Sequence, residues 1–283
     1  MIALEDRHTD ILKKASIGKS LSRKELAKRT QLDLKTINQI FEGTHVDDHH
    51  IDTVCQALEL NFKALKNHID QTHTPKPISV KGLKLFQSTF PHSEEAIMYV
   101  NNFIVYDEAQ ALALAFDTGT DFQSVKNWLK QTKLSLKSVL ITHKHRDHIH
   151  CLEDYLKTDK TLPLHASFKA QIRCKNPKPI RHGQTIQYGP FTITILETPG
   201  HTEDGISYHI KGLEKDIVIV GDALFAHSQG GILNPESYAQ AIKTNQKELL
   251  SLQEDTVIAP GHGPLTSVAH ERQYNPFYAD YFA

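Results

Sequence analysis

The stretch "LITHKHRDHIH", residues 140–150, constrains the fold of this chain more than any other segment. It places four histidines and an aspartate within eight residues, directly after an apolar run. That run, "SVLIT", is short, apolar and β-branched, which predicts a buried strand. His143 follows the predicted strand, and α/β proteins commonly place functional side chains at strand ends. The segment is therefore either a solvent-exposed, histidine-rich loop or part of a metal site.

Three further apolar runs each lead to one more candidate ligand. "FTITILETPGHT" leads to His201, "DIVIVGDALF" to Asp222 and "DTVIAPGHGP" to His262. A Pro-Gly pair directly precedes His201 and another precedes His262, which suits a tight turn that directs the side chain. Imidazole and carboxylate suit zinc, iron or manganese. An H-x-H pair could arise by chance among 18 histidines, but the ordered set favours a metal site.

Seven candidate ligands are more than a single tetrahedral metal site needs. They favour two metal ions about 3.5–4 Å apart. The candidates are His143, His145, Asp147, His148, His201, Asp222 and His262.

The H-x-H-x-D-H motif at residues 143–148, with the later His201, Asp222 and His262, resembles the metallo-β-lactamase superfamily. "TPGHT", "GDALF" and "PGHGPLTSVAHERQYNPF" resemble its glyoxalase II-like (hydroxyacylglutathione hydrolase-like) branch. The resemblance covers about residues 83–283 and implies an α/β fold, an αββα sandwich with the site at one edge. It also implies one metal held by His143, His145 and His201, a second held by Asp147, His148 and His262, and Asp222 as the bridge between them.

The resemblance implies a metal-dependent hydrolase in which Asp147 and Asp222 are catalytic. Two cations that share a water lower its pKa toward neutrality, so that hydroxide can attack a carbonyl. The same cations stabilise the developing oxyanion. A small thioester or ester suits such a site, because a thiolate leaves without a strong general acid. We expect two divalent ions, with zinc favoured and iron or manganese as alternatives.

Two observations leave the reaction open. "HSQGG", residues 227–231, has Gly231 where glyoxalase II-like proteins often carry Arg, so glutathione is not assured as part of the substrate. His227 is a candidate for a supporting role at the site or for an exposed loop position. As an alternative, the chain resembles persulfide dioxygenase, an enzyme of the same superfamily. There a single iron, held at positions like His143, His201 and Asp222, oxidises a glutathione persulfide.

The start of the chain predicts a helical module. Ser22 is expected to cap a helix over "RKELAKRT", Asp33 to cap "LKTINQIF", and Gly43 to end the second helix. Residues 21–43 resemble the Cro/C1-type (XRE-like) helix-turn-helix. That resemblance implies a recognition helix that faces the DNA major groove through Lys35, Thr36, Asn38 and Gln39.

Charge in this module is uneven. Residues 13–35 contain eight Lys or Arg and two acids, and they could contact phosphates. Residues 36–62 contain five acids and no Lys or Arg, so the alternative is a module whose surface forms a homodimer. The phosphate-contact candidates are Lys13, Lys14, Lys19, Arg23, Lys24, Lys28 and Arg29.

The segment "QTHTPKPISVKG", residues 71–82, carries two prolines and little apolar content, which indicates a linker. We therefore predict a helix-turn-helix domain over residues 1–69, a linker over 70–82 and a hydrolase domain over 83–283. The fusion also allows a transcriptional regulator whose metal domain senses a metabolite.

The chain is expected to be cytoplasmic, with no membrane partner. It has no apolar run near the ~20 residues of a spanning helix, and its start lacks the apolar core of a secretory signal. Three cysteines without a C-x-x-C pair indicate a reducing compartment.

Overall fold

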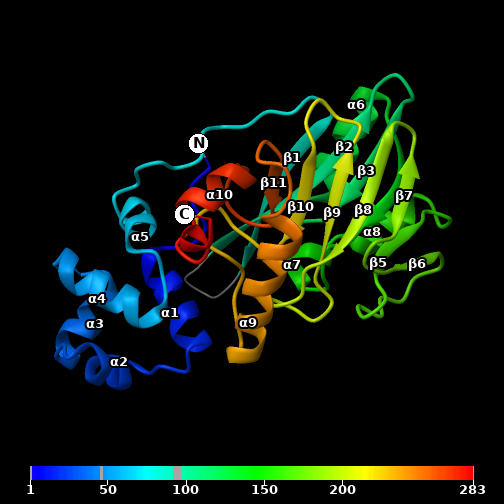
Figure 1. The fold of residues 1–283 in the computed structure, drawn as a ribbon. Helices are drawn as coiled ribbons and strands as arrows, with labels where there is room; N and C mark the ends of the chain where they lie inside the picture. Colours follow the sequence, from blue (N-terminus) through cyan, green and yellow to red (C-terminus); the bar gives the residue numbers. More distant parts are fainter. Residues whose placement is uncertain (1, 45–46, 92–96, 283) are drawn as a thin grey trace.

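The computed structural model describes residues 2–44, 47–91 and 97–282. Its N-terminal part is helical, and the rest forms two sheets flanked by helices (Figure 1). The N-terminal helices are α1 (His8–Gly18), α2 (Arg23–Thr30), α3 (Leu34–Glu42), α4 (Asp48–Leu58) and α5 (Phe62–Ile69).

The predicted ends of the two helix-turn-helix helices are confirmed. Ser22 Oγ accepts a hydrogen bond from the Glu25 amide at 3.3 Å, and Asp33 Oδ1 accepts one from the Thr36 amide at 2.8 Å. Each such cap contributes about 1 kcal/mol. Gly43 ends α3 at φ +74°. Gln31 ends α2 at φ +57°, a left-handed conformation that is uncommon for a residue with a Cβ atom.

Each sheet contains six strands. The first runs in the order β1 (Leu83–Pro91), β2 (Ile97–Asp107), β3 (Leu112–Phe116), β4 (Ser135–Leu140), β5 (Leu164–Ser167) and β6 (Pro177–Ile180). The second runs from β12 (Thr266–Ser267) through β11 (Val257–Pro260), β10 (Ile217–Gly221), β9 (Ile206–Lys211) and β8 (Phe191–Glu197) to β7 (Thr185–Tyr188). Neighbours from β3 to β6 are parallel, as are β10 and β11.

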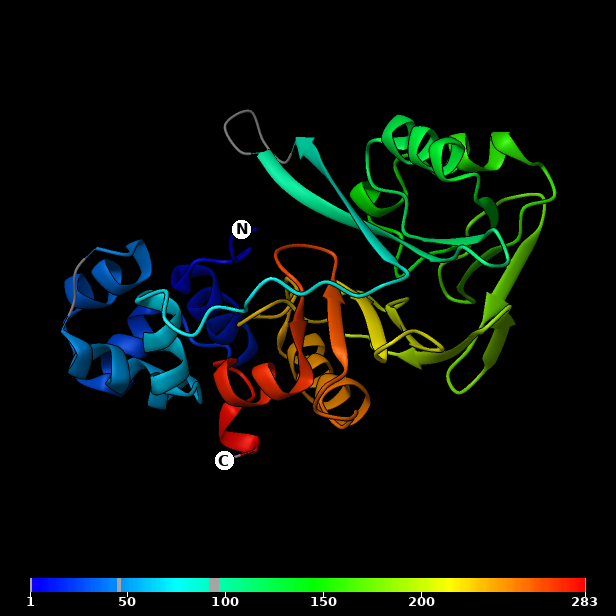
Figure 2. The same ribbon diagram turned by 90° about the horizontal axis from the view of Figure 1, so that it is seen from above.

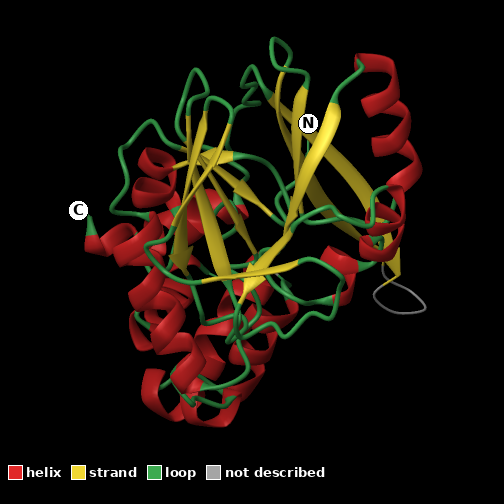
Figure 3. Ribbon diagram, turned by 90° about the vertical axis from the view of Figure 1, so that its right-hand side faces the viewer, coloured by secondary structure: helices red, strands yellow, loops and turns green. Residues whose placement is uncertain are grey.

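Helices cover the outer faces of both sheets (Figure 3). Apolar side chains of the two inner faces, among them Phe116 and Tyr208, form the core between the sheets. Outside the first sheet lie α6 (Phe122–Thr132) and α8 (Leu152–Thr158), and outside the second lie α9 (Pro235–Thr244) and α10 (Val268–Tyr274). The fold is therefore the expected αββα sandwich, preceded by a small all-α region. The short α7 (Arg146–Ile149), the π-helix Asn245–Leu249 and the 3-10 turn Ala279–Tyr281 complete the elements.

The helical region is packed against the sandwich. Helix α1 lies on α9, and its Gly18 is so close to the Tyr238 ring that an added Cβ would lie 2.2 Å from ring carbon Cγ. Ile11 and Leu12 of α1 belong to the same buried cluster as Val218 of the second sheet. Helices α2 to α4 lie at the end of the molecule away from the sheets (Figure 2).

Residues 74–80 have no regular secondary structure, and they lead from the helices to β1 along the sandwich (Figure 2). No helix in the described residues combines the length and apolar character that crossing a bilayer requires.

Candidate metal centre

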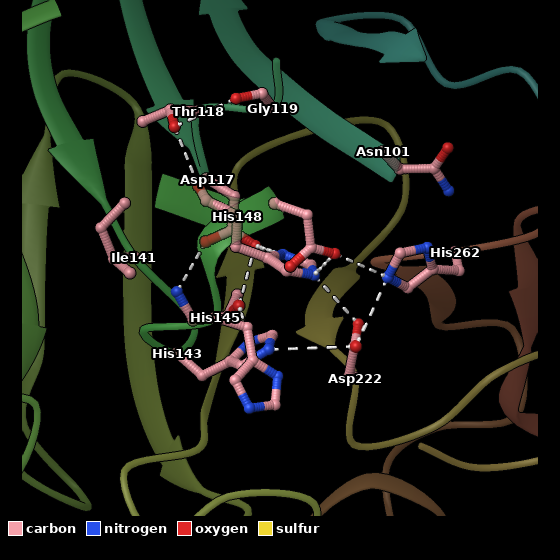
Figure 4. Close-up of polar contacts among 12 residues, drawn as sticks. Asn101, Asp117, Thr118, Gly119, Ile141, His143, His145, His148, Asp222 and His262 are labelled. Atoms are coloured by element: carbon pink, nitrogen blue, oxygen red, sulfur yellow. Dashed lines mark hydrogen bonds and ion pairs between the residues drawn. The ribbon is translucent and has the colours of Figure 1, made fainter. Parts of the chain in front are cut away.

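The seven predicted ligands come together at one edge of the sandwich. His143 follows β4, His201 follows β8, Asp222 follows β10 and His262 follows β11. Asp147 and His148 lie on the short helix α7. Because the strands of both sheets end at this edge, residues more than a hundred positions apart, such as Asp147 and His262, become neighbours (Figure 4).

The ligand atoms form two groups. The first contains His143, His145, His201 and Asp222, and the second contains Asp147, His148 and His262. Within each group the donor atoms all lie within 4.8 Å of one another. His145 is exposed, so the first group lies beside solvent, whereas the second group is buried.

Asp222 lies between the two groups (Figure 4). Its Oδ2 lies 3.5 Å from His201 Nε2 and 3.4 Å from His262 Nε2. Its Oδ1 lies 3.2 Å from His148 Nε2. One carboxylate therefore faces members of both groups, which is the position that a bridging ligand requires.

Among the described residues, three buried atoms of the centre make no well-aligned hydrogen bond, although the last two lie 3.2 Å apart: His143 Nε2, His148 Nε2 and Asp222 Oδ1. Unpaired buried polar atoms are costly, so a cluster of them calls for an explanation. Cations held by the two groups, with Asp222 facing both, would satisfy these atoms. The donor set, imidazole nitrogens with carboxylate oxygens, suits zinc, iron or manganese.

The electrostatics of the centre also favour a cation. Burial lowers the pKa of His148, but the carboxylates of Asp222 and Asp117 outweigh burial and raise it to about 10. Burial holds the pKa of His143 well below its ordinary value, so this imidazole is neutral and able to coordinate. Burial alone would raise the pKa of Asp222, yet His262 and His148 keep it well below its usual range.

Outer partners fix the orientation of the imidazoles. His201 Nδ1 donates to the Gly231 carbonyl at 2.8 Å, and His262 Nδ1 donates to the Tyr99 carbonyl at 2.7 Å. A carbonyl only accepts, so Nδ1 carries the proton in both rings. Nε2 is therefore the nitrogen of each ring that faces the centre, where His201 Nε2 lies 2.9 Å from His145 Nδ1.

Asp117, which the sequence analysis missed, supports two other imidazoles. Its Oδ2 accepts from His148 Nδ1 at 2.8 Å and from the Thr142 hydroxyl at 2.8 Å. The Thr142 oxygen in turn lies 3.0 Å from His143 Nδ1. The signal was present, because Asp117 directly follows the apolar run "LALAF" of β3.

We predict that Asp117→Asn weakens metal binding and turnover by about 10–100-fold, the usual loss when an outer partner of a ligand is removed. The amide can still accept from Thr142 but cannot supply the charge that stabilises His148. Zinc titration with a competing chelator measures the affinity. Asp255→Asn, an exposed carboxylate before β11, is the matched control. An affinity equal to that of the wild type would show that Asp117 has no supporting role.

His227 is neither exposed nor part of the centre. It is fully buried at φ +60°, and its Nε2 lies 2.8 Å from His270 Nε2 of α10. Its amide donates to Glu271, a buried carboxylate that also accepts from Thr266 and Asn275. The alternative of an exposed loop histidine is therefore wrong. The contacts of His227 with His270 and Glu271 connect the loop after β10 to α10.

The predicted DNA-contacting residues lie on α3, at the end of the molecule away from the sheets (Figure 1). Lys35 is exposed, and Gln39 is half-buried. The Thr36 hydroxyl donates to Asp33, and Asn38 Oδ1 accepts from Arg23 at 3.1 Å. Two of the four side chains therefore have partners within the chain already.

Lys14 is not available for a phosphate contact. Its side chain is 12% exposed and pairs with Asp6, and its Nζ donates to the Gln229 carbonyl. This prediction for Lys14 is wrong, because α1 faces the sandwich.

Comparison with known families identifies both parts of the chain. Residues 100–262 match the family described as the metallo-beta-lactamase superfamily, and residues 12–71 match the Cro/C1-type HTH DNA-binding domain.

Two individual relatives of this chain are also named as hydrolases. The chain is 30% identical over 197 residues to YqgX of Bacillus subtilis (strain 168), named a probable metallo-hydrolase; the match covers 62% of this chain and 90% of YqgX. It is 25% identical over 171 residues to a hydroxyacylglutathione hydrolase of Bartonella henselae, covering 60% of this chain and 66% of that protein.

Two solved structures share the fold. The BLEG-1 B3 metallo-beta-lactamase superposes with a TM-score of 0.56 at 25% identity, covering 68% of this chain and 99% of that chain. ETHE1 from Myxococcus xanthus superposes with a TM-score of 0.54 at 27% identity, covering 68% of this chain and 83% of that one.

Proposed function

Because the chain belongs to the metallo-beta-lactamase superfamily, we propose that it is a binuclear metallo-hydrolase of small thioesters or esters. The observation that carries the proposal is a trio of buried atoms without well-aligned hydrogen bonds in the described residues, on His143, His148 and Asp222, with both imidazoles within 3.9 Å of the Asp222 carboxylate. The likeness to a protein named hydroxyacylglutathione hydrolase supports the substrate class, because an acyl group joined to the sulfur of glutathione is a thioester.

In this proposal His143, His145 and His201 would hold one cation, and Asp147, His148 and His262 would hold the other. Asp222, whose carboxylate faces both groups, would serve both. When bound, the cations lower the pKa of water toward neutrality and polarise the carbonyl under attack. Asp147 Oδ2 lies 3.3 Å from His262 Nε2 and 3.5 Å from His148 Nε2, so this carboxylate is placed to orient the attacking water. The leaving thiolate needs no strong acid, and none of the seven residues has to supply a proton.

The second candidate reaction is persulfide oxidation at a single iron, which the likeness to ETHE1 brings into consideration. The compactness of the second group favours two metals over one. Asp147, His148 and His262 would have no metal to bind in a mononuclear site, although their donor atoms converge within 4.8 Å.

We predict that the purified protein holds about two divalent ions per chain and that EDTA abolishes thioester hydrolysis, which added zinc restores. Elemental mass spectrometry and a panel of acyl thioesters, a β-lactam and a glutathione persulfide measure both properties. One iron per chain with oxygen consumption on the persulfide would favour the dioxygenase. Full turnover by the metal-free protein would refute a metal-dependent reaction.

We propose further that the N-terminal helices bind DNA through α3. The match of residues 12–71 to a Cro/C1-type DNA-binding domain and the exposure of Lys35 support this role. Helix α3 lies at the end of the molecule away from the sheets (Figure 2).

We predict that duplex affinity falls as salt rises and that Lys35→Ala lowers the slope of log affinity against log salt by about 1. Fluorescence anisotropy with a labelled duplex measures the slope. Lys63→Ala, an exposed lysine on α5, is the matched control and should leave the slope unchanged. Absence of binding at low salt would leave the helices as a packing or dimerisation module.

A further inference from the structure

A cavity of about 790 Å³ lies between the sandwich and two segments outside it, the residues before α1 and the connecting residues before β1. Four segments line it: the N-terminal residues 2–5, the connecting residues 75–78, strands β1 and β2, and residues 263–265 after His262. Residues 2–7 precede α1 and are called the arm below. Two of the four walls thus come from outside the sandwich.

The cavity adjoins the candidate metal centre on the Nδ1 side of His262, although none of the seven proposed ligands lines it. Tyr99 lines it, and the Tyr99 carbonyl accepts the hydrogen bond from His262 Nδ1. Gly263, the next residue after His262, lies against the arm: a Cβ added there would lie 3.2 Å from the Glu5 amide nitrogen. Burial raises the pKa of Glu5, the charge of His262 lowers it, and the charge of Asp222 raises it, so Glu5 is close to both residues. The cavity is therefore a close neighbour of the centre on its His262 side.

The arm is held in place from both sides. The Asp6 carboxylate accepts from Lys14 of α1 and from the Ser228 hydroxyl of the loop after β10. Lys14 also donates to the carbonyl of Gln229. These contacts join the arm to the same loop that carries Asp222 at its start, so the wall formed by the arm is a fixed part of the folded chain.

The wall of the cavity is mainly apolar. Six aliphatic side chains that line it are only half-buried, and they come from the arm, the connecting segment, β1, β2 and the loop after His262. A ligand that is itself aliphatic would remove them from water, and each methylene buried strengthens binding roughly threefold to fourfold. The six are Ile2, Leu4, Ile78, Leu85, Met98 and Leu265.

We propose that this cavity binds the aliphatic chain of the substrate, which is then a medium-chain acyl thioester. The arm and residues 75–78 set the preference for chain length. The inference rests on the proposed hydrolase function for the position of the carbonyl, whereas binding of the aliphatic chain depends only on the cavity.

Acetyl and decanoyl thioesters of N-acetylcysteamine test the proposal. The wild type should favour the decanoyl ester in kcat/KM by at least about tenfold. Leu4→Arg and Ile78→Arg, which place a charge in the cavity, should abolish this preference. Leu4→Ala, which adds no charge, should reduce it less and keeps the test valid if an arginine variant fails to fold. Leu233→Arg, at an exposed leucine of the sandwich, is the matched control and should keep the preference.

Calorimetry with the decyl thioether analogue on the metal-free protein separates the cavity from the chemistry. If the wild type binds the analogue and Ile78→Arg does not, the result supports binding of the aliphatic chain in the cavity. If neither thioester is hydrolysed, that second result rejects only the proposed hydrolase function. Equal turnover of both esters, or a decanoyl preference that survives in all cavity variants, would overturn the inference and leave the hydrolase intact.

Discussion

Asp222→Asn is expected to reduce kcat/KM by more than about 100-fold, the upper range for losing an outer partner of a ligand, because Asp222 is itself a proposed ligand. The substitution keeps the shape of the side chain and removes its charge. Both oxygens lie within 3.5 Å of imidazole nitrogens from the two ligand groups, so the loss affects both metal positions. Elemental analysis should find fewer than two metals per chain.

Asp216→Asn is the matched control for this experiment. Asp216 precedes β10 and Asp222 follows it, so the two aspartates lie at opposite ends of the same strand. The control removes a carboxylate that pairs with His209 and Lys211 and should leave the metal content unchanged. If Asp222→Asn held two metals and turned over at the wild-type rate, the bridging position would be refuted.

The sequence was informative about the sandwich because ligand residues follow apolar strands. Runs such as "DIVIV" and "TVIAP" became β10 and β11, and the residues after them lie at a common edge. The helix caps at Ser22 and Asp33 were equally local signals, since each depends on a hydrogen bond to a residue three positions away. Patterns of this range can be read without knowledge of the fold.

The supporting atoms of the centre could not be predicted in the same way. The Tyr99 and Gly231 carbonyls that orient His262 and His201 are backbone groups, which any residue type would provide. His227 gave no reliable signal because its burial depends on α10, more than forty residues later.

The placement of the helical region was also beyond the sequence. The basic residues of α1 suggested a surface for DNA, but Gly18 and Lys14 face the sandwich. The periodicity of apolar residues shows that a helix buries one face and does not show which partner covers it.

Gly261→Ala is expected to lower kcat/KM by about 100-fold, the loss associated with a misplacement of about 1 Å in an active site. A Cβ at residue 261 would lie 2.3 Å from Asp222 Oδ1 and 2.5 Å from His148 Cε1, far inside contact distance. The backbone cannot retreat easily, because the Gly261 amide donates to Gly221 at 2.8 Å and its carbonyl accepts from Asn101 at 2.7 Å. The two proposed ligands must therefore move.

Gly231→Ala shows whether this effect is steric, because it also adds a methyl group beside the centre. A Cβ at Gly231 would lie 3.8 Å from His201 Nδ1, an ordinary contact, and the Gly231 carbonyl that accepts from His201 would remain. Turnover and metal content of Gly231→Ala should therefore stay close to those of the wild type, while both fall in Gly261→Ala. Equal losses in the two variants would mean that any added methyl group disturbs this edge, and wild-type behaviour of Gly261→Ala would contradict the close packing of Asp222 and His148 around one glycine.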